Sequence, residues 1–328
     1  MNDLELSLSF RPSAADMESV RRLPHDLLPS ISVVIPSFNQ ASFLRETLES
    51  VFAQSYPNME VFVADGGSRD GSTKILEEYA ARLPGTAFRF DSRPDGGHWQ
   101  GVNKGIANTS GDIVAWINSD DIYLPDAFWK VAAFFHFNRA TLIAYGRNRY
   151  VDQNLDHVTD YPVDWSPLLR EQRRRMMHFC LPPQPSLFFR RAAVTLCGAL
   201  GSKILDYELW LRWQRDLPFG FIDDHLSLSR LHADAITANA DHSLLNGICR
   251  TVHQYYGCVP YSWAFRYAYT VKHGAAWARR ENPAIGRSLH LRARLLWVWL
   301  NLKWAPGLFK RNLVALRGWL RESARISS

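Results

Sequence analysis

The chain has 328 residues, of which 47% are hydrophobic and 21% are charged. This length and composition are sufficient for a full hydrophobic core and exclude a chain that is disordered overall. The four cysteines lack C-x-x-C spacing and the density of a disulfide framework, which argues against a secreted scaffold or a zinc site and favours a reducing cytoplasm.

The formal net charge of +6 is distributed unevenly along the chain. Residues 262–328 hold 13 Lys and Arg against 2 Asp and Glu, a net charge of +11. Residues 1–261 hold the other 25 Lys and Arg residues against 30 Asp and Glu residues, a net charge of −5. A mildly acidic body therefore precedes a basic tail, and we expect the tail to have a physical role of its own.

Three segments are predicted from composition and pattern: a polar leader over residues 1–30, an α/β body over 31–235, and a helical, basic, Trp-rich region over 236–328. Met1–Glu5 shows neither the basic nor the apolar part of a secretory signal, so none is expected. The longest uninterrupted apolar run near the C-terminus, Leu295–Leu300, has six residues. A helix needs about 20 to cross a bilayer.

Strands and helices alternate from Ile31 onward. This alternation is typical of right-handed βαβ units and predicts a mostly parallel sheet flanked by helices. Ser42 and Ser72 are predicted to cap the first two helices. The predicted strands are Ile31–Ile35, Val61–Ala64, Ala87–Phe90 and Ile113–Ile117, and a short helix is predicted over Gln100–Ala107.

The regular alternation weakens in the second half of the body. Residues 146–180 are polar and are predicted to be irregular, and substrate specificity is expected to lie in residues 146–205. From Ser243 onward the pattern is helical. The elements predicted here are a helix over Ala127–Phe137, strands over Leu142–Tyr145, Pro185–Arg190 and Leu226–His232, and a helix that begins near Asp206.

Acidic residues follow three successive predicted strands: Asp65, Asp95 and the pair Asp120 and Asp121. Open α/β sheets bind ligands beyond the carboxyl ends of their strands, and paired carboxylates there favour a divalent cation that carries phosphates. Taken alone, Asp65 and the pair Asp120 and Asp121 are better explained as turn or loop residues. The glycine-containing loop after Asp65 matches neither the G-x-G-x-x-G nor the P-loop motif, so a dinucleotide-binding or P-loop enzyme is disfavoured.

Seven motifs occur in one order within residues 31–235. Together they resemble the family 2 glycosyltransferases of the GT-A fold, and the resemblance does not extend to residues 236–328. The motifs are V-V-I-P-S-F-N, A-D-G-G-S-R-D-G-S, R-P-D-G-G, N-K-G-I-A, W-I-N-S-D-D, Q-P-S-L-F-F-R-R and D-Y-E-L-W-L-R.

The resemblance implies a binding site for a nucleotide-sugar donor. Asp65 matches the acid that contacts the base, and Pro36 and Phe38 match residues that line the base pocket. Asp95 matches the acid that helps to hold the nucleotide. From the residues alone, Trp99 in its glycine-flanked loop is a candidate for stacking on a sugar ring, with core packing as the alternative.

The resemblance also implies a metal site. Asp120 matches the metal-binding acid of the D-x-D motif, and Asp121 beside it is counted among the donor contacts. Asn118 stands where many members have the first Asp, so the divalent cation, Mn²⁺ or Mg²⁺, is expected to be held more weakly. His232 matches a late histidine that touches metal or diphosphate in related enzymes.

Asp206 matches the usual catalytic base, although Leu205 replaces the preceding Glu. Its position at the start of an amphipathic helix suits a general base that faces the substrate, and also suits an N-cap. Direct attack by the acceptor hydroxyl would invert the anomeric centre. Glu208 is read as a supporting residue or an ion-pair partner, and His98, His178 and His225 are assigned no function.

The basic tail predicts contact with an anionic membrane surface. Arg292, Arg294 and Lys303 flank Leu295–Leu300, and a second amphipathic stripe lies within Phe309–Arg321. Such helices lie in a membrane interface with cations near the headgroups; packing of the stripe on the body is the alternative. No nucleic-acid-reading motif is present, so no nucleic-acid partner is expected.

The leading hypothesis is an inverting glycosyltransferase of the cytoplasm, peripheral at the inner face of the cell membrane. It would move a sugar, expected from a UDP-sugar, to a glycan or lipid-linked acceptor in envelope or exopolysaccharide assembly. Two alternatives stay open: a catalytically silent sugar-nucleotide-binding scaffold, motivated by Asn118 and Leu205, and a nucleotidyltransferase, in which the Asp206 segment would lack a role.

Overall fold

The protein is described here from a computed structural model. It describes residues 9–83, 85, 87–201, 205–232, 235, 242–273 and 287–304. The chain divides into two compact units. The first comprises Met1–Met176 and Cys180–Ala235, and the second comprises Met177–Phe179 and Ile236–Ser328.

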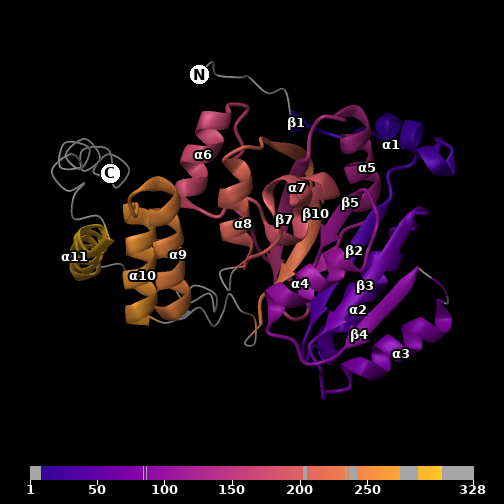
Figure 1. The fold of residues 1–328 in the computed structure, drawn as a ribbon, viewed down its shortest axis with the longest axis horizontal. Coiled ribbons are helices and arrows are strands. Elements are labelled where there is room, and N and C mark those ends of the chain that lie inside the picture. The colour runs from indigo at the N-terminus through magenta and orange to yellow at the C-terminus, as the bar shows by residue number, and fades with distance from the viewer. Residues whose placement is uncertain are drawn as a thin grey trace. The chain divides into compact units, whose positions relative to one another are not determined.

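One sheet forms the centre of the first unit (Figure 1). Within the described residues its ten strands are β1 (Ser9–Phe10), β2 (Ile31–Ser37), β3 (Met59–Asp65), β4 (Phe88–Ser92), β5 (Ile113–Trp116), β6 (Ile122–Tyr123), β7 (Ile143–Val151), β8 (His157–Asp160), β9 (Leu187–Arg190) and β10 (Phe219–Arg230). Their order is β1-β10-β7-β9-β5-β2-β3-β4, with β6 paired to β10 and β8 paired to β7. Strands β5, β2, β3 and β4 are parallel, and β9 is antiparallel to both of its neighbours. The predicted α/β class with a mostly parallel sheet is confirmed.

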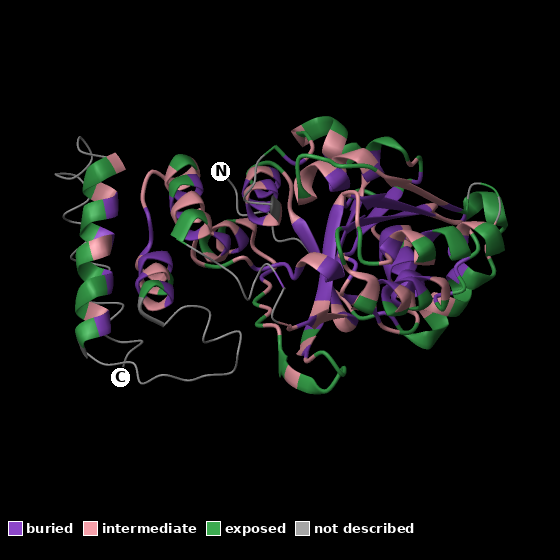
Figure 2. Cartoon of the chain, turned by 90° about the horizontal axis from the view of Figure 1, so that it is seen from below, coloured by how far each residue is buried: buried purple, intermediate pink, exposed green. Residues whose placement is uncertain are grey.

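Helices flank this sheet on both faces. In the described part of residues 9–235 they are α1 (Ala14–Arg21), α2 (Ala41–Phe52), α3 (Ser72–Arg82), α4 (His98–Ala107), α5 (Ala127–Phe137), α6 (Leu169–His178), α7 (Arg191–Cys197) and α8 (Leu205–Gln214), with short 3₁₀ turns at His25–Leu27 and Gln184–Ser186. The central strands β2 and β5 are wholly buried, whereas the helices expose their outer sides (Figure 2). Burial on both faces explains why β2 and β5 are largely apolar in the sequence.

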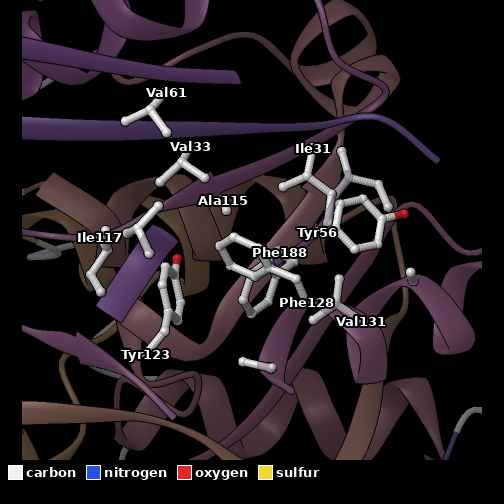
Figure 3. Close-up of a cluster of buried hydrophobic side chains, with 14 of the residues drawn as sticks. Ile31, Val33, Tyr56, Val61, Ala115, Ile117, Tyr123, Phe128, Val131 and Phe188 are labelled. Atoms are coloured by element: carbon white, nitrogen blue, oxygen red, sulfur yellow. The ribbon is translucent and has the colours of Figure 1, made fainter. Parts of the chain in front are cut away.

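Alternate strand residues pack on opposite sides of the sheet. Val33, Val61 and Ala115 lie in one buried cluster with Phe128 of α5 (Figure 3), and apolar residues of α2 and α3 belong to the same cluster. Val34 faces the other side, where α4 approaches so closely that a Cβ at Gly105 would lie 2.3 Å from Val34 Cγ1. A glycine at that position lets α4 lie close against β2.

The predicted helix caps are wrong. Helix α2 begins at Ala41 after Gln40, and α3 begins at Ser72 itself after Gly71. The backbone N–H groups at the start of α2 are instead bonded by residues about 30 positions later. Asp70 Oδ2 accepts from the Ala41 N–H at 2.8 Å, and Ser72 Oγ, at the start of α3, accepts from the Gln40 N–H at 3.2 Å. Donors at a helix N-terminus need an acceptor, but the acceptor can come from a distant part of the chain.

The prediction that residues 146–180 are irregular is also wrong. Strand β7 continues to Val151, β8 pairs with it, and α6 follows. Helix α6 shows little apolar periodicity, and polar contacts hold it in place. Arg173 donates to the carbonyl of Gln214 at 3.1 Å, and Arg175 pairs with Asp164. Strand β10 likewise begins at Phe219, well before the predicted Leu226.

The second unit contains α9 (His242–Tyr256), α10 (Tyr261–His273) and α11 (Arg287–Trp304). Helix α10 packs against α9 and α11, and the buried side of α11 carries Leu289, Ala293, Trp297 and Leu300. Trp297 Nε1 donates to the Val259 carbonyl at 2.7 Å. In the described part of the chain, no helix combines the length and the apolar character that a membrane crossing requires. The predicted stripe within Phe309–Arg321 lies outside the described residues.

Candidate functional site at the carboxyl edge of the sheet

The predicted site residues follow the ends of four neighbouring strands. Strands β5, β2, β3 and β4 lie side by side and point the same way, so their carboxyl ends share one edge. Phe38 follows β2, Asp65 ends β3, Asp95 follows β4, and Asp120 follows β5. The sheet topology therefore brings together acids that are up to 55 residues apart in the chain.

Asp65 is fully buried and shapes the loop that follows it. Its Oδ2 accepts from the backbone N–H groups of Gly67 at 3.1 Å and Ser68 at 2.9 Å, and from Ser92 Oγ at 2.6 Å. Its Oδ1 accepts from Ser68 Oγ at 2.5 Å. The carboxylate thus holds the glycine loop and joins the ends of β3 and β4.

Phe38, Pro36 and Asp95 lie beside this loop. Phe38 is 60% exposed, whereas Pro36 is buried within β2. A Cβ at Gly66 would lie 3.2 Å from Phe38 Cδ2 and 3.5 Å from Asp95 Oδ1. A Cβ at Gly101 would lie 3.3 Å from Asp95 Oδ2 and 3.5 Å from Pro36 Cβ. The three residues predicted to bind the nucleotide are therefore close together, and an exposed aromatic ring stands beside a carboxylate.

Asp120 and His232 meet although 111 residues separate them in the chain. His232 Nε2 lies 2.9 Å from Asp120 Oδ2, and the two side chains are only 5% and 15% exposed, respectively. His232 follows β10, which reaches this edge through its pairing with β7 and β6. The contact joins two elements that no sequence spacing relates.

Asp121 has a different environment from its neighbour. Its side chain is buried, and its Oδ1 accepts from the Arg230 N–H at 3.0 Å. Burial, together with the neighbouring Asp120 carboxylate, raises the pKa of Asp121 well above its usual range. Asp121 therefore fastens the end of β10, and with it His232, to the loop after β5. Its predicted contact with the donor gains no support from this position.

A divalent cation fits the Asp120 and His232 pair. The described residues contain no cluster of three or more His, Cys, Asp and Glu side chains that could hold a metal. Two protein ligands are nevertheless a usual number for Mg²⁺ or Mn²⁺ when substrate phosphates and water supply the remaining oxygens. Asn118, at the position of the missing acid, is engaged elsewhere.

Asn118 Oδ1 contacts His98 Nε2 at 2.8 Å, which makes His98 a site residue that the sequence did not indicate. Burial lowers the pKa of His98, so the ring is neutral near pH 7. Gln184 is the second such residue, because its Nε2 donates to the Trp116 carbonyl at 2.6 Å. The sequence signals for them were the position of His98 two glycines after Asp95, and the position of Gln184 at the start of the Q-P-S-L-F-F-R-R motif.

Asp206 lies in the first turn of α8, one residue after the helix start. Burial raises its pKa to about 6, and its Oδ1 accepts from the Tyr207 N–H at 2.8 Å. Trp210, one turn later on the same helical face, contacts Trp116 at the end of β5 with 6.2 Å between ring centroids. Hydrogen bonds of 2.6 and 3.1 Å between Asn103 of α4 and Leu200 hold the segment before α8.

Trp99 and Glu208 are two further residues that the sequence singles out. Trp99 follows His98 on α4, and its indole N–H is buried without an acceptor. Glu208 forms an ion pair with Arg212 at 3.0 Å, which is one of the two roles predicted for it. The acidic and aromatic residues of α4, α8 and the strand ends thus form one candidate site with a neutral histidine, a carboxyl of raised pKa and a carboxylate–imidazole pair.

Comparisons with known proteins identify relatives of the body of the chain. Residues 32–194 match the family model described as glycosyl transferase family 2. An uncharacterized glycosyltransferase of Rickettsia felis is 28% identical over 218 residues, which cover 63% of this chain and 35% of that relative. The matched region is therefore about a third of the length of this relative.

Solved structures share the fold at low sequence identity. Staphylococcus aureus TarS 1–349 in complex with UDP-GlcNAc superimposes with a TM-score of 0.54 and 17% identity over 83% of this chain and 79% of that one. A mannosyltransferase from Pyrobaculum calidifontis in complex with GDP-Man and Mn²⁺ superimposes with a TM-score of 0.50 and 14% identity. This match covers 95% of this chain and 86% of that one. These similarities establish the GT-A fold.

Proposed function

Because the chain belongs to glycosyl transferase family 2 through residues 32–194, we propose that it transfers a sugar from a nucleotide-activated donor to a hydroxyl group of a glycan or lipid-linked acceptor. The observation that carries this proposal is the partly buried Asp206 carboxyl, whose pKa of about 6 suits a general base, on a helix packed at the carboxyl edge of the sheet. A UDP-sugar is the first candidate donor, since a structure of the same fold holds UDP-GlcNAc.

In this proposal the nucleotide binds beside the ends of β2, β3 and β4. Phe38 offers an exposed ring for the base, and Asp65 holds the loop beside this ring in place. Asp95 accepts from the Gly97 N–H at 2.8 Å through Oδ1, which leaves Oδ2 for a ribose hydroxyl. A donor contact by Asp65 itself would replace one of the four hydrogen bonds it now accepts.

Asp120 and His232 would hold the divalent cation. When bound, such a cation neutralises the diphosphate leaving group as a Lewis acid. Asp120 supplies a carboxylate oxygen and His232 an imidazole nitrogen, and Asp121 and Arg230 keep the two elements aligned. The Mn²⁺ in the complex of a mannosyltransferase of the same fold supports this assignment.

Asp206 would take the proton of the acceptor hydroxyl as its oxygen attacks the anomeric carbon. The bond between that carbon and the diphosphate oxygen breaks, and the nucleoside diphosphate leaves with the electron pair. A single displacement of this kind inverts the anomeric centre. Asp206 needs no charged partner for this role, because desolvation alone raises its pKa toward neutrality.

The experiment that tests the proposal is release of nucleoside diphosphate from a panel of UDP- and GDP-sugars, with and without Mn²⁺, using lipid-linked and soluble glycan acceptors. Acceptor-dependent release is the expected result. Binding of a sugar nucleotide without turnover would instead indicate a silent scaffold, and pyrophosphate release from a nucleoside triphosphate would indicate nucleotidyl transfer.

The rate of transfer is expected to depend on pH through Asp206. A general base acts only when deprotonated, so with a pKa of about 6 the turnover number should rise with pH and level off above about pH 7. At pH 5, about a tenth of the base is ionised, and turnover should fall about tenfold. A pH profile of product formation at saturating donor and acceptor measures this. A flat profile from pH 5 to 8 would rule out this carboxyl as the base.

Helix α11 would bring the enzyme to an acceptor at an anionic membrane surface. Leu291 and Leu295 of this helix are 58% and 63% exposed, and Val298 and Leu302, which are also exposed, continue the same helical stripe. Trp299 is half-exposed beneath the ammonium of Lys303 at 4.6 Å. An apolar stripe bordered by cations and Trp matches the chemistry of a membrane interface.

Replacement of Leu295 by Glu is expected to weaken binding to vesicles that contain phosphatidylserine by about tenfold, because it removes buried apolar area and adds a repelled charge. Co-sedimentation of the full chain measures this. The matched control is Leu196→Glu on α7, another leucine with a largely exposed side chain. Equal losses for the two variants, or unchanged binding for both, would contradict a role of the α11 stripe.

A further inference from the structure

Trp116 is the centre of a cluster that the proposed roles do not explain. It ends β5, and its ring lies 5.6 Å from that of His98 on α4 and 6.2 Å from that of Trp210 on α8. Its carbonyl accepts from Gln184 Nε2 at 2.6 Å. Gln184 thereby extends the contact between β5 and β9 beyond their last paired residues, Ala115 and Phe188.

Four polar atoms of this cluster are shielded from solvent and lack a hydrogen-bond partner. They are His98 Nδ1, Gln184 Oε1 and the indole nitrogens of Trp116 and Trp210. Buried polar groups in native proteins are nearly always paired, and leaving one unpaired is costly. Four unpaired polar atoms in one cluster mark a place where a ligand, rather than the protein, completes the hydrogen bonds.

The partners of His98 and Gln184 define what the free atoms offer. With Asn118 Oδ1 as acceptor, His98 Nε2 carries the hydrogen and Nδ1 is an acceptor. Gln184 Nε2 is committed to the Trp116 carbonyl, so Oε1 is an acceptor too. The two indoles are donors. Two acceptors and two donors among aromatic rings match hydroxyl groups, which both donate and accept, and do not match a phosphate, which only accepts.

The cluster lies between the two functional ends of the site. His98 is close enough to Asp95 and Asp120, the proposed diphosphate side, for their charges to act on it. On the other side, Trp210 lies one turn after Asp206, the proposed base. In a nucleotide sugar, the ring to be transferred lies between the diphosphate and the attacking hydroxyl.

We infer that His98 and Gln184 bind hydroxyl groups of the donor's sugar ring, with the indoles of Trp116 and Trp210 completing this subsite. The inference rests on the proposed function and adds to it the residues that select the sugar. The side chains of His98 and Gln184 are partly exposed, whereas those of Trp116 and Trp210 are fully buried.

The test measures the contribution of the sugar to binding. Isothermal titration calorimetry with the full chain gives the Kd of UDP-Glc, UDP-GlcNAc, UDP-Gal and GDP-Man, and of UDP and GDP alone, each with Mn²⁺. For the tightest sugar nucleotide, Gln184→Met is expected to raise the Kd about tenfold, with the Kd of the nucleoside diphosphate changed less than twofold.

A pair of His98 variants locates the effect on one ring nitrogen. The amide of Gln reaches the position of Nε2, so His98→Gln keeps a partner for Asn118 and loses Nδ1, whereas His98→Asn keeps a polar group near Nδ1. We expect His98→Gln to weaken sugar-nucleotide binding about tenfold and His98→Asn to weaken it less. The control is Gln214→Met, which removes another buried glutamine with an unpaired Oε1 and should leave both Kd values unchanged.

Each other outcome overturns the inference. Unchanged Kd values in Gln184→Met and His98→Gln, with thermal midpoints that show folded protein, would mean that the sugar binds elsewhere while the proposed function stands. Equal weakening of nucleoside diphosphate would mean a diphosphate contact. A rise in the acceptor KM alone would assign the subsite to an acceptor sugar. If the wild type binds no sugar nucleotide, the proposed function itself fails, and the inference with it.

Discussion

Replacement of Asp206 by Asn is expected to lower the rate of sugar transfer by about 10²–10⁴-fold while donor binding persists. The amide has nearly the same shape but cannot take a proton from the acceptor hydroxyl. The turnover number should therefore fall with little change in the Kd of the donor. Release of nucleoside diphosphate under saturating conditions, together with calorimetry, separates the two quantities.

The same variant is expected to be more stable than the wild type near neutral pH. Burial raises the pKa of Asp206 from 3.8 to about 6, so the folded state holds the proton more tightly than the unfolded state. The free energy of unfolding therefore decreases as pH rises from about 4 through 6, by about 2–3 kcal/mol in total. Asn carries no charge and avoids this loss, so the stability difference should be present at pH 7.5 and small at pH 4.

Urea denaturation of both proteins at pH 4 and pH 7.5 measures this difference. The matched control is Glu208→Gln on the same helix, where the carboxylate forms an ion pair with Arg212. That change should leave turnover within about threefold and should not stabilise the protein, since exposed and partly exposed pairs contribute about 0–1 kcal/mol. An active Asp206→Asn variant, or one less stable than the wild type at pH 7.5, would contradict the assignment.

Removal of either Asp120 or His232 is expected to weaken donor binding in Mn²⁺ by about 10–100-fold. The two side chains lie 2.9 Å apart and would share one cation, so Asp120→Asn, His232→Ala and the double variant should have similar effects instead of additive ones. Chelation of the metal by EDTA should reduce donor affinity of the wild type by a similar factor and change that of the variants little.

Direct binding of Mn²⁺, followed by electron paramagnetic resonance in the absence of donor, provides a readout that is independent of activity. Asp126→Asn and His225→Ala are the controls, because Asp126 pairs with Arg21 and His225 faces Asp160. Both should retain metal and donor affinity. Donor binding that is insensitive to EDTA and to the two site variants would remove the metal from the proposed function.

Several features of the fold were predictable because they depend on local patterns. Largely apolar runs such as Ile31–Ile35 and Ile113–Ile117 indicated strands, and the alternation with helices indicated a parallel sheet. The helix over Ala127–Phe137 has the bounds expected from its composition. The acids at strand ends followed from the same reasoning, since parallel strands end at one edge.

Features that depend on distant contacts were mispredicted or missed. Helix α2 is capped by Asp70 from the next loop, and α6 is held by carbonyls of Gln214 and Arg215 rather than by an apolar stripe. Gln184 opens one of the family motifs, but neither its position nor that of His98 indicated a role, and their convergence on Trp116 appears only in the structure. Spacing along a chain does not record which acceptors meet which donors after folding.

By itself, the sequence determined the alternation of strands and helices from Ile31 to Phe137, the identity of the acids at the strand ends, and the ordered motifs of family 2. These follow from periodicity and residue type, which are local properties. Only the tertiary structure decided that Asp120 meets His232 while Asp121 is turned inward, and that Asp206 has a pKa near 6. Burial and electrostatic environment are set by neighbours far apart in the chain, and those neighbours exist only in the folded protein.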